Sequence, residues 1–188
     1  MRLFVALDVP EETRRALGET IRRFEIVCHD ARWMRAESIH VTLKFIGHVE
    51  ETKLPAIKDS LANVKSRGPI EIAFGNFGFF PNERRPRVFW LGIEAGPDLA
   101  ALAANISSAL EPIGIPREER AFRPHLTLAR FKTEKGLPKL REIVAPLAHQ
   151  SFGNTVASQF HLYESMLNPS GAVHTKLASY SFAESPTP

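Results

Sequence analysis

Two short segments of the chain repeat one pattern of residue types. The first reads His40-Val41-Thr42-Leu43 and the second reads His125-Leu126-Thr127-Leu128, with nearly half of the 188-residue chain between them. Residues i and i+2 of a β-strand point to the same face of a sheet, so each segment predicts a strand that presents an imidazole beside a hydroxyl. The repeat predicts an internal duplication that places one copy of the motif in each of two lobes.

The sequence around these segments alternates between helical and strand patterns. Apolar residues at helical spacing predict helices over residues 10–27, 50–64, 98–110 and 138–148, with Asp98 as the N-cap of the third. Strands are expected over residues 3–7, 39–46, 70–80, 87–93 and 122–131. One long strand over residues 152–167 is expected to form a hairpin with residues 172–182. Short turns join several neighbouring strands, which favours an α+β or α/β fold with antiparallel pairing.

Composition limits the class of protein. Apolar residues make up 44% of the chain and charged residues 24%, which is enough apolar material for one domain or for two lobes that share a core. The net charge of +3 permits a polyanionic partner without requiring one. The single cysteine, Cys28, excludes an intrachain disulfide and suits a reducing cytoplasm. No stretch is long enough to span a membrane, so we expect a cytoplasmic protein without a membrane partner. We also expect a monomer.

Two imidazoles and two hydroxyls around one small volume suit an anionic phosphate. A neutral histidine can take a proton from water while a protonated one gives a proton to a leaving ribose oxygen, because the imidazole pKa lies near neutrality. The hydroxyls of Thr42 and Thr127 would donate hydrogen bonds to the non-bridging oxygens. This physics does not decide which histidine has which role. No zinc spacing and no Gly-rich phosphate loop occurs in the sequence, so neither a metal nor a cofactor is expected.

Other residues are weaker candidates for the same site. Arg130 lies just beyond the second motif and is a candidate phosphate ligand, although strict alternation points it away from His125. Lys44 and His48 share the parity of His40 and are candidate substrate-binding residues, His48 only for a remote nucleotide. Four aromatic residues could stack on a base, but we expect each to pack in the core: Trp33, Phe77, Phe79 and Trp90. We expect the remaining histidines to be exposed or hydrogen-bonded: His29, His149, His161 and His174.

The paired segments resemble the two HxTx motifs of the two-histidine phosphoesterase superfamily. With their flanks, the chain is similar over nearly its whole length to the RNA 2',3'-cyclic phosphodiesterases, also called 2'-5' RNA ligases. The flanks are MRLFVALDVP at residues 1–10, Trp33 and SIHVTLKFIG at 38–47, RPRVFWLGI at 85–93, FRPHLTLAR at 122–130 and the hairpin turn at 168–171. His174 departs from the pattern, because tyrosine is more typical there.

The resemblance implies an α+β fold and a reaction. The fold would be one bilobal domain over residues 1–188, with pseudo-twofold symmetry, antiparallel sheets lining a central cleft, helices outside and a frayed tail at 184–188. The reaction would be metal-independent hydrolysis of RNA 2',3'-cyclic phosphate ends, such as those of tRNA halves, to 2'-phosphates. His40 would be the proton donor and His125 the proton acceptor. Formation of a 2'-5' linkage would be the same chemistry in reverse.

Two alternatives remain open at this point. A cyclic phosphodiesterase of small nucleotides would use the same histidines on a shorter substrate. A non-catalytic RNA-binding module would keep a basic cleft but would need neither imidazole.

Overall fold

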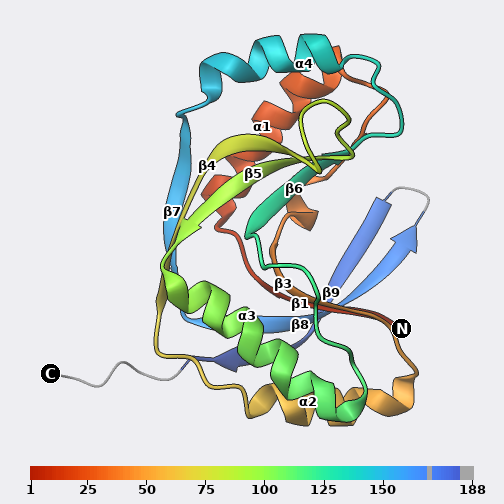
Figure 1. Ribbon diagram of the computed structural model, residues 1–188, viewed down its shortest axis with the longest axis vertical. Coiled ribbons are helices and arrows are strands. Elements are labelled where there is room, and N and C mark those ends of the chain that lie inside the picture. Colours follow the sequence, from red (N-terminus) through yellow and green to blue (C-terminus); the bar gives the residue numbers. More distant parts are fainter. Residues whose placement is uncertain (169–170, 183–188) are drawn as a thin grey trace, which may run out of the picture.

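The computed structural model describes residues 1–168 and 171–182, which form two antiparallel sheets and four α-helices (Figure 1). The helices are α1 (Glu11–Val27), α2 (Leu54–Ala62), α3 (Pro97–Leu110) and α4 (Leu137–Val144). The strands are β1 (Arg2–Leu7), β2 (Arg32–Trp33), β3 (Val41–His48), β4 (Ile70–Phe80), β5 (Val88–Ala95), β6 (His125–Arg130), β7 (Ser151–Ala157), β8 (Gln159–Asn168) and β9 (Gly171–Ser181). The α+β class is therefore confirmed.

The two sheets repeat one arrangement of strands. The smaller sheet has the order β3-β1-β8-β9, and the larger sheet has the order β2-β6-β5-β4-β7. Without the two-residue strand β2, the order β6-β5-β4-β7 matches the smaller sheet strand for strand, and every pairing is antiparallel. The strands that carry the two motifs, β3 and β6, occupy corresponding places. The expected pseudo-twofold relation is thus visible in the topology.

The helices connect the lobes by crossing between them. Helix α1 follows β1 of the smaller sheet but packs near β7 and α4 of the larger one. Helix α3 follows β5 of the larger sheet but packs near β3 and α2 at the opposite end of the molecule (Figure 1). Buried residues of both lobes, among them Leu17 of α1 and Ile106 of α3, belong to one continuous apolar core. Each sheet is therefore covered partly by a helix that follows a strand of the other sheet.

The predicted elements are largely confirmed, with differences at their ends. Asp98 is not the N-cap of α3: Gly96 holds that position, and Asp98 lies in the first turn behind Pro97. Proline is favoured there because its missing N–H would be unpaired anyway. The helix expected over 50–64 begins with a 3₁₀ turn at Glu51–Lys53, and the one expected over 138–148 ends with a 3₁₀ turn at Ala145–Leu147.

The prediction of one long strand over residues 152–167 is wrong. The segment forms two strands, β7 at the edge of the larger sheet and β8 inside the smaller one, and the chain passes from sheet to sheet at Ser158. Both halves carry strand-forming residues, so local pattern does not reveal that they pair in different sheets. The hairpin of β8 with β9 is confirmed. Part of its predicted turn, residues 169–170, and the tail at 184–188 lie outside the described residues.

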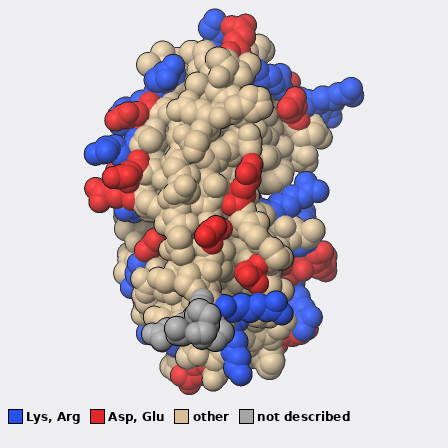
Figure 2. Space-filling view, turned by 90° about the vertical axis from the view of Figure 1, so that its left-hand side faces the viewer, with Lys and Arg blue, Asp and Glu red and all other residues tan. Residues whose placement is uncertain are grey.

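The molecular surface carries both signs of charge. On the face shown in Figure 2, Lys and Arg side chains lie mainly at the edges and the lower part, whereas Asp and Glu side chains lie both at the edges and near the middle. Among the described residues, no helix is long and apolar enough to cross a membrane. A polyanionic ligand would therefore be bound by local groups of charged side chains.

Candidate active site

The two motif strands lie next to each other although they belong to different sheets. Residues of β3 approach residues of β6 within 8 Å between Cα atoms. His40 immediately precedes β3, and His125 is the first residue of β6. The fold thus brings the two motifs to one region between the sheets, where the strand pattern predicted two imidazoles and two hydroxyls.

The two imidazoles are held by the same hydrogen bond. His40 Nδ1 lies 2.8 Å from the carbonyl oxygen of Ser38, and His125 Nδ1 lies 2.7 Å from that of Arg123. A carbonyl oxygen only accepts, so Nδ1 carries the proton in both rings. In the neutral rings Nε2 is then an unprotonated base, and neither Nε2 has a hydrogen-bond partner among the described residues. Such an arrangement suits proton transfer at Nε2.

Aromatic rings hold each imidazole from the neighbouring strands. The His40 ring stacks on Phe4, with centroids 4.5 Å apart, and meets the ring of His174 edge-on at 5.1 Å. The His125 ring meets Phe80 edge-on at 5.0 Å and lies 6.4 Å from Trp90. Both histidines are therefore positioned by packing as well as by hydrogen bonds.

The surroundings lower the pKa of both imidazoles. Burial, with a contribution from the neighbouring His174, lowers the pKa of His40 to about 4, although the Ser38 carbonyl and Asp8 oppose the shift. Burial also lowers the pKa of His125, and Arg130 adds to the effect. Desolvation disfavours the charged imidazolium in both cases. Both rings are therefore neutral bases near pH 7 until an anion approaches.

A β-bulge falls at the same position of each motif. Against β1, Thr42 pairs with Ala6 and Lys44 with Val5, so Leu43 is the extra residue. Against β5, Thr127 pairs with Trp90 and Ala129 with Phe89, so Leu128 is the extra residue. These leucines are the fourth residues of their motifs. An extra residue in one strand reverses the alternation of side chains beyond it.

The bulges decide which following residues share a face with the histidines. Arg130 pairs with Val88, two residues before Trp90, so it returns to the face of His125. Phe45, the matching residue of the first motif, pairs with Phe4 and is 54% exposed. The expectation that strict alternation turns Arg130 away is therefore wrong, because Leu128 is bulged.

The same reasoning corrects the expectation for Lys44. Lys44 pairs with the core residue Val5, is only 5% exposed, and its Nζ donates a hydrogen bond of 2.6 Å to the carbonyl oxygen of Pro116. It does not extend the face of His40. A second register shift, between Leu3 and Phe4, returns His48 to the side of Arg2 and Phe4.

The threonines are available to a ligand. Thr42 and Thr127 are half-buried, and neither hydroxyl makes a hydrogen bond to a described residue. Each stands two residues beyond its histidine and before the bulge, so strand alternation places it on the histidine's face. Their binding of non-bridging phosphate oxygens stays a prediction.

His174 differs from the expectation that it is exposed or hydrogen-bonded. Its two ring nitrogens are buried and have no partner among the described residues. The ring packs edge-on against both Phe4 and His40, at 5.0 and 5.1 Å. Burial lowers the pKa of His174, and Arg2 contributes to that shift. A third imidazole with a lowered pKa therefore lies against His40.

A polar cluster adjoins both Phe4 and His40. Asp8 accepts hydrogen bonds from Tyr163 and from Lys176 Nζ, the latter at 2.7 Å, and lies 3.3 Å from His161 Nε2. His161 holds the pKa of Asp8 well below its usual range. The Tyr163 ring stacks on Phe4 at 5.2 Å. Asp8 is thus an ionised carboxylate that holds Tyr163, whose ring lies 6.5 Å from that of His40.

Of the four proposed base-stacking residues, three pack in the core as expected. Trp33 lies against Phe24 and Phe89, and its Nε1 donates to the Cys28 carbonyl at 2.8 Å. Phe77 and Phe79 both pack on Phe89. Trp90 differs, because its indole lies beside His125 and directly over Gly78, where a Cβ atom would approach the ring to 2.1 Å.

The remaining candidates are structural. Cys28 is buried at the C-terminal end of α1, and burial raises the pKa of its thiol. His161 is hydrogen-bonded to Ser179, and His29 is exposed beside Asp30. No group of three or more His, Cys, Asp or Glu side chains in residues 1–168 and 171–182 is placed to hold a metal.

Sequence reasoning missed the residues that reach the two imidazoles from other strands. Phe4 and His174 come from β1 and β9, and Phe80 comes from β4. They stand far from the motifs in the sequence, so no local pattern connects them. The sequence does contain a signal for Phe45, because Phe45 follows His40 by five residues, just as Arg130 follows His125.

Comparisons with known proteins show the family to which the chain belongs. A model of the 2'-5' RNA ligase superfamily matches residues 10–165. The RNA 2',3'-cyclic phosphodiesterase of Archaeoglobus fulgidus is 34% identical over 177 residues, which is 94% of this chain and 98% of the relative. The protein of that name from Thermotoga maritima is 31% identical over 185 residues, covering 97% of this chain and 96% of the relative.

Solved structures show the same architecture. TT0787 of Thermus thermophilus superposes with a TM-score of 0.80 at 30% identity, over 98% of this chain and 99% of that one. The E. coli LigT complex with 3'-AMP superposes with a TM-score of 0.77 at 25% identity, over 97% and 98% of the two chains. With its paired motifs on corresponding strands of two sheets, the chain belongs to the 2'-5' RNA ligase superfamily.

Proposed function

We propose that the protein hydrolyses 2',3'-cyclic phosphate ends of RNA to 2'-phosphates. One observation carries the proposal: two imidazoles on adjacent strands each have Nδ1 tied to the carbonyl two residues earlier and Nε2 without a partner among the described residues. The curated relatives named above carry the name RNA 2',3'-cyclic phosphodiesterase, which favours this substrate over other phosphodiesters.

The reaction needs one proton taken and one given. His125 Nε2 accepts a proton from a water molecule as the water oxygen bonds to phosphorus. The bond from phosphorus to the ribose 3'-oxygen breaks, and His40, protonated at Nε2, gives its proton to that oxygen. The resemblance of the motifs, rather than the geometry, supports this assignment of donor and acceptor.

The phosphate supplies the charge that the acid requires. His40 has a pKa of about 4 in the unliganded protein, so it is mostly neutral near pH 7. A bound phosphodiester anion raises the pKa of a neighbouring imidazole and so favours the protonated donor. The hydroxyls of Thr42 and Thr127 and the guanidinium of Arg130 would hold the non-bridging oxygens.

The same groups serve the reverse reaction. When a ribose 5'-hydroxyl takes the place of water, its oxygen bonds to the phosphorus of the cyclic end and the bond from phosphorus to the 3'-oxygen breaks, so that a 2'-5' linkage forms. His125 again accepts the proton of the attacking hydroxyl, and His40 gives a proton to the 3'-oxygen. Because one chain supplies both motifs, a monomer suffices. Ends such as those of tRNA halves, in the reducing cytoplasm that the lone Cys28 suits, are the substrates we infer.

Product analysis on a defined cyclic-ended oligoribonucleotide tests the proposal. We expect a 2'-phosphate as the product, and undiminished turnover in excess chelator. A 3'-phosphate product would contradict the assigned leaving oxygen, and loss of activity on chelation would contradict the metal-independent step.

A further inference from the structure

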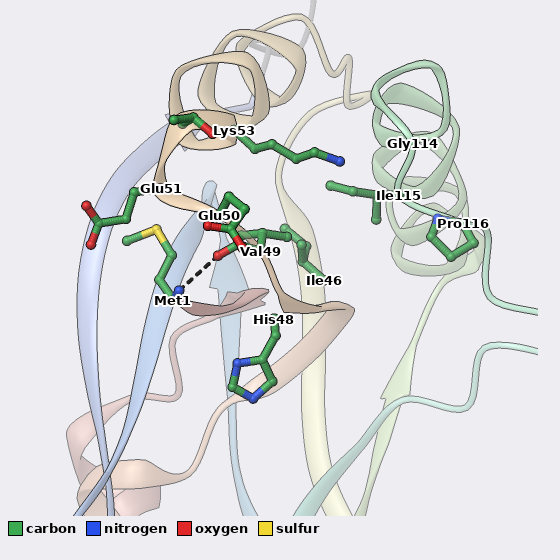
Figure 3. A pocket seen from close by; sticks show the side chains of 11 residues that line it. Met1, Ile46, His48, Val49, Glu50, Glu51, Lys53, Gly114, Ile115 and Pro116 are labelled. Atoms are coloured by element: carbon green, nitrogen blue, oxygen red, sulfur yellow. Dashed lines mark hydrogen bonds between the residues drawn. The ribbon is translucent and has the colours of Figure 1, made fainter.

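A pocket of about 710 Å³ lies at the outer end of β3 (Figure 3). Apolar side chains of Ile46, Val49 and Ile115 form part of its wall, and Lys53 extends across it toward Ile115 and Gly114. His48 lies at its edge. A volume in this range is typical of small-molecule sites. No residue of the two motifs lines this pocket.

Two segments connect this pocket with the candidate active site. Strand β3 leads from His40 to His48 at the pocket. The segment 116–124 leads from Pro116 in the pocket wall to His125, and its Arg123 carbonyl holds the His125 ring. Strand β3 and the segment 116–124 thus both run between the candidate site and the pocket.

The side chains along β3 suit a single-stranded nucleic acid. The two register shifts of β3 place Phe45 and His48 on the face of Phe4 and Arg2, which is the face of His40. Phe45 is 54% exposed, and an exposed aromatic ring is a platform for any base. The face therefore continues from His40 through Phe45 to the pocket.

The pocket lining carries one lysine, which could hold a phosphate, and two glutamates. Lys53 is exposed and makes no ion pair with a described residue, and it points into the pocket. Two carboxylates stand at the rim, Glu50 and Glu51, and that of Glu51 points away from Lys53. Cations beside an apolar wall can hold a phosphate and a base together.

We propose that this pocket is a second subsite, which binds an upstream nucleotide of the RNA whose cyclic end lies between His40 and His125. The inference rests on the proposed function and deepens it, because it makes an oligonucleotide the preferred substrate. His48 lies on the order of 26 Å along an extended strand from His40, which is too far for one nucleotide to reach both. The subsite therefore discriminates by length.

The test compares a cyclic mononucleotide with cyclic-ended oligonucleotides up to an octamer. In the wild type, kcat/KM rises with length until the chain reaches the pocket. In Lys53→Glu the ratio of octamer to mononucleotide kcat/KM falls several-fold. In Lys53→Ala the slope of log kcat/KM against log salt for the octamer becomes shallower by about 0.7, the value for one phosphate contact with a single strand.

Lys65→Glu is the matched control, because Lys65 is exposed, lies outside the pocket and undergoes the same change of charge. An equal fall of the ratio in Lys65→Glu, or no fall in Lys53→Glu, would overturn the subsite. Affinity for a 5'-labelled octamer ending in a 3'-phosphate, measured by fluorescence anisotropy, separates the two proposals. If the octamer binds in a way that depends on Lys53 but no cyclic end is hydrolysed, the proposed function is contradicted and the subsite is retained.

Discussion

At the scale of single residues, the two imidazoles share a hydrogen bond but differ in their neighbours. His40 lies among Phe4, His174 and, more distantly, Asp8, whereas His125 lies beside Phe80 and near Arg130. Because proton transfer depends on small differences in pKa, these neighbours decide the pH at which one ring is protonated and the other is not.

Removing either imidazole tests the acid–base pair. We expect His40→Ala and His125→Ala each to lower kcat by about 10²–10⁴-fold, the usual contribution of one positioned proton-transfer group. Initial rates on a cyclic-ended oligonucleotide measure the effect. His149→Ala, at an exposed position outside the site, is the control. Full activity in either motif variant would assign the reaction to other residues.

The pH dependence follows from the lowered pKa values. For kcat/KM, which reports the free enzyme, one imidazole must be protonated and the other neutral, so the optimum lies between their two pKa values. Both lie below the usual 6.5, so we expect a bell-shaped profile with its optimum below pH 6.5 and a decline above it. In kcat the bound phosphate raises the pKa of the donor, so its optimum lies at higher pH. A monotonic kcat/KM profile, with chemistry rate-limiting, would contradict the paired roles.

His174 adjusts the donor through space. Its ring lies 5.1 Å from that of His40, and its charge lowers the pKa of His40. His174→Phe keeps a ring in the same place and removes that charge, so the pKa of His40 rises and the kcat/KM optimum moves to higher pH. His174→Tyr should show the same shift. An unchanged profile with a lowered rate would limit His174 to packing.

At the scale of elements, the bulges at Leu43 and Leu128 select the side chains that reach the cleft. A regular β6 would keep His125 and Thr127 on one face but would turn Arg130 to the other. The same extra residue in β3 moves Lys44 into the interior and brings Phe45 forward. The same bulge in both strands therefore gives the site one side with the cation of Arg130 and another side with the aromatic ring of Phe45.

The approach of β4 to the indole of Trp90 gives a prediction at this scale. A Cβ at Gly78 would lie 2.1 Å from the Trp90 ring, so Gly78→Ala displaces the indole beside His125. We expect a loss of about 1–3 kcal/mol of stability, typical of overpacking, together with a lower kcat. Thermal unfolding and steady-state rates measure both. Gly75→Ala, on the same strand with its nearest contact at 3.4 Å, should have little effect; equal effects would refute the packing argument.

At the scale of the whole molecule, the exchange of helices α1 and α3 between lobes makes the two sheets depend on each other. Each lobe loses part of its apolar cover when the other unfolds. We therefore propose that the bilobal chain unfolds as one domain, so that the distance between the motifs is maintained throughout the native state.

The positions of the two tryptophans allow a test of this cooperativity. Trp33 and Trp90 both belong to the larger sheet, whereas Ile57 of α2 is fully buried on the side of the smaller sheet. Ile57→Ala should destabilise the protein by about 2–5 kcal/mol. Tryptophan fluorescence and far-UV circular dichroism should then shift together in urea. A shift in circular dichroism alone would mean that the lobes unfold separately.

Consecutive residues were enough to predict most strands and helices, an α+β or α/β fold with antiparallel pairing, and the two histidine–threonine pairs, because strand alternation and helical periodicity are local properties of a chain. The division of residues 151–168 between two sheets, the bulges at Leu43 and Leu128 and the place of His174 against His40 emerged only from the folded molecule. Those features depend on pairing between segments far apart in the chain. No local pattern records which strand a residue will face, or how far its neighbours will displace its pKa.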